Sequence, residues 1–185
     1  MNRVLITGIT GMVGSHLADF LLKNTDWEIW GMLRWRSPLD NISHLLERVN
    51  SNDRVHLVYG DLNDQISLLK IIDESNPDYV FHLAAQSYPK TSFESPLDTY
   101  NTNVIGTARF LEAFRQLNQD PWIHVCASSE VFGRVPEEKL PVFSPGQVVY
   151  HLNYGYRGLV VDSDPTCQAA DAWYHSNQTQ PQRDQ

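Results

Sequence analysis

The chain has 185 residues, a hydrophobic content of 42%, a charged content of 19% and a net charge of −8. These values exclude an intrinsically disordered chain, and the length suits one domain with a sizeable core and an appendage. The acidic balance gives no reason to expect nucleic acid or an anionic membrane surface as a partner. We find neither a signal-peptide core nor a long apolar run, so we expect neither secretion nor membrane spanning.

The cysteines and the other candidate metal ligands give little further signal. Cys126 and Cys167 lie far apart and predict no disulfide framework, which is typical of a reducing compartment. We therefore expect a cytoplasmic protein, and we predict no metal site.

The strongest functional signal lies in the first fourteen residues. The β-branched apolar run 4–7 predicts a buried strand, residues 15–23 have helical spacing, and Gly8, Gly11 and Gly14 lie between them. Such a glycine-rich turn lets the backbone approach a pyrophosphate, whose charge the helix N-terminus stabilises. The strand–turn–helix context favours dinucleotide binding over a merely structural turn.

The second predicted strand, residues 27–33, is followed by Arg34 and Arg36, and no acidic residue occurs until Asp40. NAD enzymes of this type usually place an acid here to accept a hydrogen bond from the ribose 2′-hydroxyl. Guanidinium groups instead suit a 2′-phosphate, because they are always charged and bind in a bidentate manner. We therefore predict NADP rather than NAD; the alternative is that these arginines are solvated loop residues.

A third strand, 54–59, precedes Asp61, for which two roles remain open. At a strand end its carboxylate can accept from an adenine amino group, or it can cap the helix predicted over 65–73.

A fourth strand, 79–83, is followed by the small residues Ala84 and Ala85. Small residues at this position leave room for a flat ligand against the backbone, where open α/β sheets bind ligands.

A long helix is predicted over 97–118 and a fifth strand over 122–127. Five strands that alternate with helices predict an α/β fold with a Rossmann-type, doubly wound parallel sheet.

Two hydroxyls and a carboxylate follow the fifth strand, at Ser128, Ser129 and Glu130. A serine there can hold a sugar hydroxyl. A carboxylate can remove a carbon-bound proton once the neighbouring carbon is a ketone. The alternatives are hydrogen bonding within a turn for the serines and a solvated charge for Glu130.

Several of these segments, in this order and spacing, resemble the extended short-chain dehydrogenase/reductases, the NAD-dependent epimerase/dehydratase family. Within that family the chain is most similar to the GDP-mannose 4,6-dehydratases over residues 1–141. The resemblance implies a bound NADP that oxidises C4 of a nucleotide sugar, loss of water across C5 and C6, and return of the hydride to C6. The matching segments are Gly8–Gly14, Asp61–Leu62, His82–Ser87, Ser92–Pro96, Asn103–Thr107 and Ser128–Gly133.

The resemblance also implies a role for individual residues. It places the pyrophosphate at the glycine turn, the 2′-phosphate at Arg34, the adenine between Asp61 and Leu62, and the nicotinamide beside the residues after strand four. Ser87 would lie where cofactor and sugar meet. The implied cofactor-binding residues are Gly8, Thr10, Gly11, Met12, Val13, Gly14, Arg34, Asp61, Leu62, Leu83, Ala84, Ala85 and Ser87.

For catalysis, the resemblance implies that Ser128 contacts the C4 hydroxyl and that Glu130 removes the C5 proton. Epimerases of the superfamily usually lack an acid at this place, so Glu130 favours a dehydratase over an epimerase or 4-keto reductase. The implied substrate is a nucleotide sugar, GDP-mannose, and the family forms homodimers through a four-helix bundle.

After Pro141 the resemblance stops. The family carries Tyr-x-x-x-Lys on its next helix, but no lysine follows Lys139, and the residues four positions after Tyr150, Tyr154 and Tyr156 are not lysine. A tyrosine with an ordinary pKa near 10 is a poor base at neutral pH. We therefore expect an inactive or weakly active dehydratase, with a non-catalytic NADP-binding protein as the alternative.

We divide the chain into a dinucleotide-binding domain, 1–141, an atypical tail, 142–175, and a disordered end, 176–185. Residues 147–152 and 158–161 can form two short strands. We interpret the tail as the result of a shifted reading frame, an altered splice or a miscalled gene end. The helix from Leu97 lacks its family companion, which predicts an incomplete dimer interface and an exposed apolar face.

Overall fold

The computed structural model describes residues 1–51, 53–128, 148–150 and 157–159, and the chain divides into two compact units, Met1–Ala127 and Ser128–Gln185. The first unit contains a five-stranded parallel sheet with the strand order β3-β2-β1-β4-β5. This confirms the Rossmann-type fold and all five predicted strands. They are β1 (Arg3–Thr7), β2 (Glu28–Leu33), β3 (Val55–Tyr59), β4 (Tyr79–His82) and β5 (Trp122–Val125).

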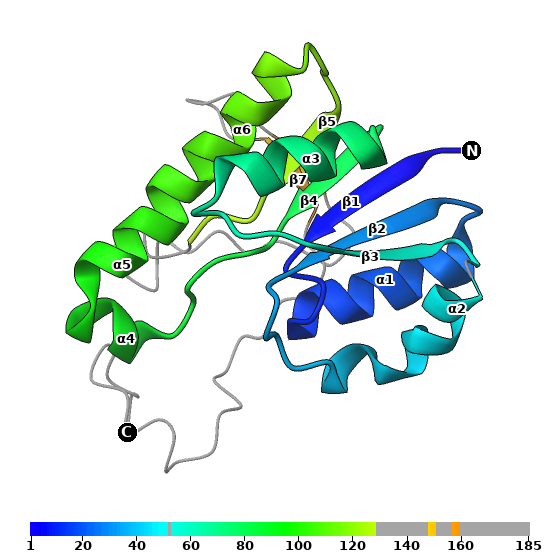
Figure 1. Cartoon of the computed structure of the whole chain (residues 1–185), viewed down its shortest axis with the longest axis horizontal. Helices are drawn as coiled ribbons and strands as arrows, with labels where there is room; N and C mark the ends of the chain where they lie inside the picture. The colour runs from blue at the N-terminus through cyan, green and yellow to red at the C-terminus, as the bar shows by residue number, and fades with distance from the viewer. Residues whose placement is uncertain (52, 129–147, 151–156, 160–185) are drawn as a thin grey trace. The chain divides into compact units, whose positions relative to one another are not determined.

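Helices cover both faces of this sheet, as Figure 1 shows, with α1 and α2 on one side and α3 and α6 on the other. The helical segments are α1 (Met12–Asn24), the 3₁₀ helix η1 (Asp40–Leu45), α2 (Leu46–Asn50), α3 (Gln65–Ser75), α4 (Pro89–Glu94), α5 (Pro96–Tyr100), the π-helix η2 (Asn101–Ile105) and α6 (Gly106–Gln116).

The alternation of side chains along β1 generates two separate cores. Val4 and Ile6 pack into the cluster beneath α1 and η1, while Leu5 packs with Val80 and Phe110 into the cluster beneath α3 and α6. All five side chains are fully buried. The strand is apolar on both faces because helices cover both, which is the arrangement of a doubly wound sheet.

The helix predicted over 97–118 is present as α5, η2 and α6 in succession, with π-helical geometry in the middle. Its buried residues include Phe110 and Phe114. Leu97, Val104 and Leu111 recur at helical spacing on the exposed surface instead, so the exposed apolar face that we expected is present in this unit.

The N-terminus of α3 resolves one of the alternatives for Asp61. The Asp64 carboxylate caps this helix, since it accepts hydrogen bonds from the backbone N–H groups of Ile66 and Ser67 at 3.1 and 3.3 Å. Asp61 instead accepts from the N–H of Asn63 at 2.9 Å. The capping role for Asp61 is therefore wrong, because the residue three positions later fills it.

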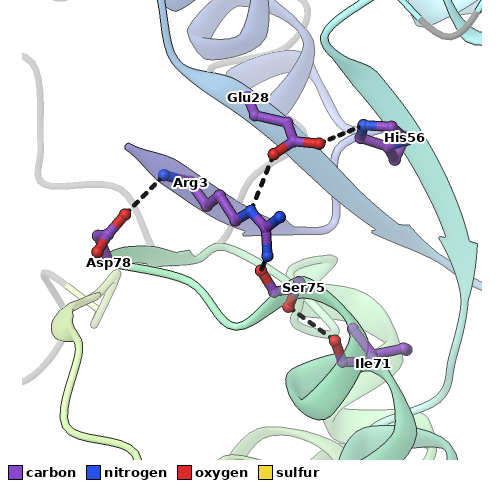
Figure 2. A network of polar contacts seen from close by, with 6 residues as sticks. All are labelled: Arg3, Glu28, His56, Ile71, Ser75 and Asp78. Carbon is purple, nitrogen blue, oxygen red and sulfur yellow. Dashed lines mark hydrogen bonds and ion pairs between the residues drawn. The ribbon is translucent and has the colours of Figure 1, made fainter. Parts of the chain in front are cut away.

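A network of polar contacts lies at the amino ends of the parallel strands (Figure 2). Arg3 donates from Nε to Glu28 at 2.9 Å, and the other oxygen of Glu28 pairs with His56 Nε2 at 2.7 Å. The Arg3 backbone N–H donates to Asp78 at 2.8 Å, and its guanidinium donates to the Ser75 carbonyl at 3.3 Å. We call these five residues the amino-edge network.

In the second unit, β6 (Val148–Tyr150) pairs antiparallel with β7 (Arg157–Leu159), which confirms the two short strands expected in the tail. Tyr150 is the register partner of Arg157, so Tyr150 lies on a strand and not on a helix. Residues 176–185, predicted to be disordered, lie outside the described residues. Within the described residues, no helix has the length and apolar character needed to cross a membrane.

Candidate cofactor site

The carboxyl ends of the strands in the first unit border a cleft of about 430 Å³. This is the edge at which open α/β sheets bind their ligands. Many of the residues predicted to bind a cofactor lie together here. They are Gly8, Thr10, Gly11, Arg34, Asp61, Leu62, Leu83, Ala84, Ala85 and Ser87.

The glycine turn is packed closely against the neighbouring backbone. Gly8 has a φ of +74°, a conformation that only glycine adopts without strain, and a Cβ there would lie 3.0 Å from Cα and N of Ala84. A Cβ on Gly14 would lie 2.5 Å from the carbonyl oxygen of Gly8 and 2.8 Å from Cα of Ile9. These two glycines therefore allow α1 and the loop after β4 to approach the turn closely.

Helix α1 begins at Met12, one residue after the turn, so Met12, Val13 and Gly14 form its first turn. Met12 and Val13 are exposed, and Gly14 is buried against the turn. None of the three is among the described residues that line the cleft. Their side chains do not shape the cleft, but first-turn N–H groups lack an intrahelical partner and are the usual anion donors.

Arg34 directly follows β2, lines the cleft and is exposed. Its backbone forms a closed turn with Ser37: Ser37 N–H donates to the Arg34 carbonyl at 3.0 Å, and Arg34 N–H donates to Ser37 Oγ at 3.2 Å. Among the described residues no carboxylate pairs with Arg34, and Arg36 does not line the cleft. Arg34 is thus a cleft residue, whereas Arg36 belongs to the loop alone.

Asp61 and Leu62 follow β3, the strand that pairs with β2 in the sheet. The Asp61 backbone N–H donates to Ser67 Oγ at 3.2 Å, and its carboxylate oxygen Oδ1 receives the Asn63 N–H. Leu62 is buried in the core beneath α3 and α6. The loop therefore combines an anchored apolar residue with a carboxylate at the cleft.

The loop after β4 forms the other wall and is held by hydrogen bonds from two directions. Thr7 Oγ1 accepts from the N–H groups of Leu83 and Ala84 at 3.1 and 3.0 Å. Asn103 accepts from the Gln86 N–H at 2.7 Å and donates to the Gln86 carbonyl at 2.8 Å. The structure therefore supports a structural role for Asn103, whose side chain holds the backbone of Gln86 through both of its polar groups.

Sequence reasoning missed several residues that line the cleft. Asp98 and Thr102 reach it from α5 and η2, and they are four positions apart, as expected for one helix face. Polar residues at this spacing were the available signal, but the apolar spacing of the same helix concealed it. The other missed residues are Met32, Leu33, Ser37, Asn63, Gln86 and Tyr88.

The structure does not test the roles of the two predicted catalytic residues. Ser128 is exposed, is the first residue of the second unit and is not among the described lining residues of the cleft, and Glu130 lies outside the described residues. Their roles remain predictions. Among the described residues, no cluster of His, Cys, Asp and Glu could hold a metal ion.

Comparison with solved structures gives the same fold. A crystal structure of UDP-glucose 4-epimerase is 26% identical, with a TM-score of 0.62, and the match covers 73% of this chain and 38% of that one. A second UDP-glucose 4-epimerase, from Stenotrophomonas maltophila, is 22% identical with a TM-score of 0.64 over 77% of this chain and 41% of that one.

The tail matches a different family. The family model of the hemimethylated DNA-binding protein YccV like covers residues 141–185. This contradicts a shifted reading frame as the origin of the tail, because a chance reading frame is not expected to resemble a protein family; the altered splice and the miscalled gene end stay untested.

Relatives of known description match the first part of the chain. The GDP-mannose 4,6-dehydratase of Drosophila melanogaster is 36% identical over 82% of this chain, and that of Vibrio cholerae is 40% identical over 78%. In both cases the match covers 41% of the relative, so the chain spans about two fifths of their length. The family model of GDP-mannose 4,6 dehydratase covers residues 5–144. The chain therefore belongs to the GDP-mannose 4,6-dehydratase family.

Proposed function

We propose that the first unit binds NADP and that the chain is a nucleotide-sugar 4,6-dehydratase with impaired turnover. The observation that carries the proposal is the single cleft that combines the glycine turn, Arg34 and Asp61. Gly8 and Gly11 line the cleft without side chains, so the turn lets a pyrophosphate approach the backbone closely.

In this proposal each wall of the cleft holds one part of the cofactor. The N–H groups of the first turn of α1 bind the pyrophosphate, and Arg34 binds the 2′-phosphate. Asp61 accepts from the adenine amino group, while Leu83, Ala84 and Ala85 border the nicotinamide. When bound, NADP would supply the acceptor for the hydride at C4 of the sugar.

The proposed substrate is GDP-mannose, as the names of the relatives suggest. Ser128 would hold the C4 hydroxyl and Glu130 would remove the C5 proton. The chain contains no lysine after Lys139, so no Tyr-x-x-x-Lys pair lowers the pKa of a tyrosine for this reaction. We therefore expect cofactor binding with little or no turnover. We also expect any homodimer to rest on the exposed face of α5 and α6.

Two measurements on the full chain test this proposal. Titration with NADPH, followed by its fluorescence, should give saturable binding that is tighter than binding of NADH. Incubation with GDP-mannose should give little 4-keto product by its alkaline absorbance. Absence of saturable NADPH binding would refute the cofactor proposal. Fast turnover would refute the importance of the missing lysine, and an epimerised sugar would favour the epimerase alternative.

For the tail we retain the expectation that nucleic acid is not a partner. The matched family is named for DNA binding, but residues 141–185 contain two arginines, no lysine and four aspartates. DNA binding depends on cations that neutralise phosphates, and this segment has a negative balance. A gel-shift assay with a hemimethylated duplex at low salt should show no complex; a salt-sensitive complex would overturn this expectation.

A further inference from the structure

A chain of hydrogen bonds, buried between Thr7 and His82 and partly buried at Thr107, connects β1, β4 and α6 beside the cleft. Thr7 Oγ1 lies 2.9 Å from His82 Nδ1, and His82 Nε2 lies 3.1 Å from Thr107 Oγ1. Thr7 is completely buried, and His82 is 3% exposed. We call Thr7, His82 and Thr107 the buried relay.

The surrounding partners fix the direction of every hydrogen bond in the buried relay. Thr107 donates its proton to the Asn103 carbonyl at 2.7 Å, so its oxygen must accept from His82 Nε2–H. Nδ1 of the same ring then accepts the Thr7 hydroxyl proton. The Thr7 oxygen is thereby free to accept the two backbone N–H groups after β4. His82 is thus neutral, with its proton on Nε2.

The environment of the ring supports this protonation state independently. Burial lowers the pKa of His82 from 6.5 to about 4. The imidazole also stacks on Phe110, with ring centroids 4.8 Å apart. A charged imidazolium would carry a hydrogen on Nδ1 as well and could not accept the Thr7 hydroxyl proton, so the relay would break at Nδ1.

The buried relay ends at groups that line the cleft. The two N–H groups bound by Thr7 belong to Leu83 and Ala84, and Ala84 is the residue against which Gly8 packs. At its other end, the relay meets the backbone of Asn103, whose side chain holds Gln86. The relay therefore holds the loop after β4 at two points, directly at Leu83 and Ala84 and through Asn103 at Gln86.

We propose that Thr7, His82 and Thr107 are positioning residues that set the nicotinamide side of the cofactor cleft. They act through the backbone of Leu83 and Ala84 and touch no ligand themselves. This inference rests on the proposed function, because it assumes that the cleft binds a dinucleotide. It goes further in assigning one half of that ligand to the relay, while Arg34 and Asp61 hold the adenine half.

A matched pair of variants at Thr7 tests the proposal on the full chain. Thr7→Val keeps the shape of the side chain but removes the acceptor, whereas Thr7→Ser retains the hydroxyl. The affinities for NADPH and for 2′,5′-ADP, which contains only the adenine half with its 2′-phosphate, are measured for each. Thr7→Val should weaken NADPH binding about tenfold and leave 2′,5′-ADP binding unchanged. Thr7→Ser should bind both ligands as tightly as the unaltered chain.

Other outcomes overturn the proposal in distinguishable ways. A parallel loss of both affinities with thermal stability would indicate a general structural role, and an unchanged affinity for NADPH would exclude positioning. If the unaltered chain binds 2′,5′-ADP but not NADPH, or neither ligand, the proposed function itself fails, and the relay proposal fails with it.

A second measurement needs no variant and holds even if Thr7→Val does not fold. Nitrogen-15 spectra of the unaltered chain at neutral pH should show His82 as the Nε2–H tautomer. NADPH should shift its signals, and 2′,5′-ADP should not. A charged ring, an Nδ1–H tautomer or equal shifts with both ligands would contradict the proposal.

Discussion

The two edges of the parallel sheet use similar residues for different purposes. At the amino edge, Arg3 and His56 both pair with Glu28, and Asp78 receives the Arg3 N–H, so these charges are satisfied within the protein (Figure 2). At the carboxyl edge, Arg34 lines the cleft, and no carboxylate among the described residues pairs with it.

This contrast shows why residue type alone is a weak guide to function. An arginine near a strand end either braces the sheet or remains open for a ligand, depending on whether a carboxylate occurs at the same edge. Burial also differs, since Glu28 and His56 each expose only 21% of their side chains whereas Arg34 is exposed. We therefore expect variants at the amino edge to change stability and variants at the carboxyl edge to change binding.

The largest effect is expected at Gly14, because a substitution there should reduce both stability and cofactor binding. In Gly14→Ala the Cβ would meet backbone atoms of Gly8 and Ile9, which cannot move without displacing α1. We expect a loss of about 3 kcal/mol in the free energy of unfolding, together with loss of NADPH binding. Urea denaturation measures the first. Gly11→Ala, where the nearest atom is 3.2 Å away, is the graded control and should cost less. Equal effects would contradict this steric explanation.

The next prediction concerns the loss of stability at low pH, and it compares substitutions of His82 and His56. The folded pKa of His82 is about 4, below the unfolded value of 6.5, so the unfolded chain takes up the proton first. The stability from neutral His82 is fully present above pH 6.5, declines as the pH falls towards 4 and is lost below that. The stability difference between the unaltered chain and His82→Phe should narrow by up to about 3 kcal/mol over this range.

Denaturation at several pH values measures this narrowing. His56→Phe is the matched control at the amino edge, since it removes a partly exposed histidine that pairs with Glu28 rather than one in an apolar core. A stability difference for His82→Phe that is constant between pH 6.5 and 4 would show that the ring is not held neutral.

Much of the fold could be predicted from the sequence because its signals are local. Apolar β-branched runs and glycine punctuation located all five strands, and alternation with helices made the sheet parallel. The two strands of the tail were also found from apolar runs. The π-helical segment Asn101–Ile105 could not be predicted, because no local sequence pattern distinguishes it from the α-helix on either side.

The candidate site was predictable where the chain itself forms it and not where distant segments meet. Gly8 and Arg34 follow strands directly, and their neighbours in sequence identify them. Asp98 and Thr102 reach the cleft from a helix that follows β4, and no local pattern indicates which face of it borders the ligand. His82 matched a family segment, but its partners Thr7 and Thr107 are 75 and 25 residues away.

A smaller effect, confined to binding, is expected at Arg34. Arg34→Gln should weaken NADPH binding roughly 10- to 100-fold, because hydrogen bonds to charged groups contribute about 1.5–3 kcal/mol. NADH lacks the 2′-phosphate, so its affinity should not change, and neither should the urea midpoint. Arg36→Gln, which alters the loop but not the cleft, is the control. Equal losses for both nucleotides, or for both arginines, would remove the basis for NADP preference.

The smallest effect is expected at Glu28, and it tests the other half of the comparison. Glu28→Gln retains the shape of the side chain but removes the charge that holds Arg3 and His56 at 2.9 and 2.7 Å. Because the pairs are only partly buried, water compensates for much of the loss, and we expect about 1 kcal/mol in the free energy of unfolding. NADPH affinity should remain unchanged, because none of the five residues of the amino-edge network is among the described residues that line the cleft. Urea denaturation and the fluorescence titration, performed on the same preparation, measure the two quantities together. A loss of affinity without a loss of stability would reverse the assignment of the two edges.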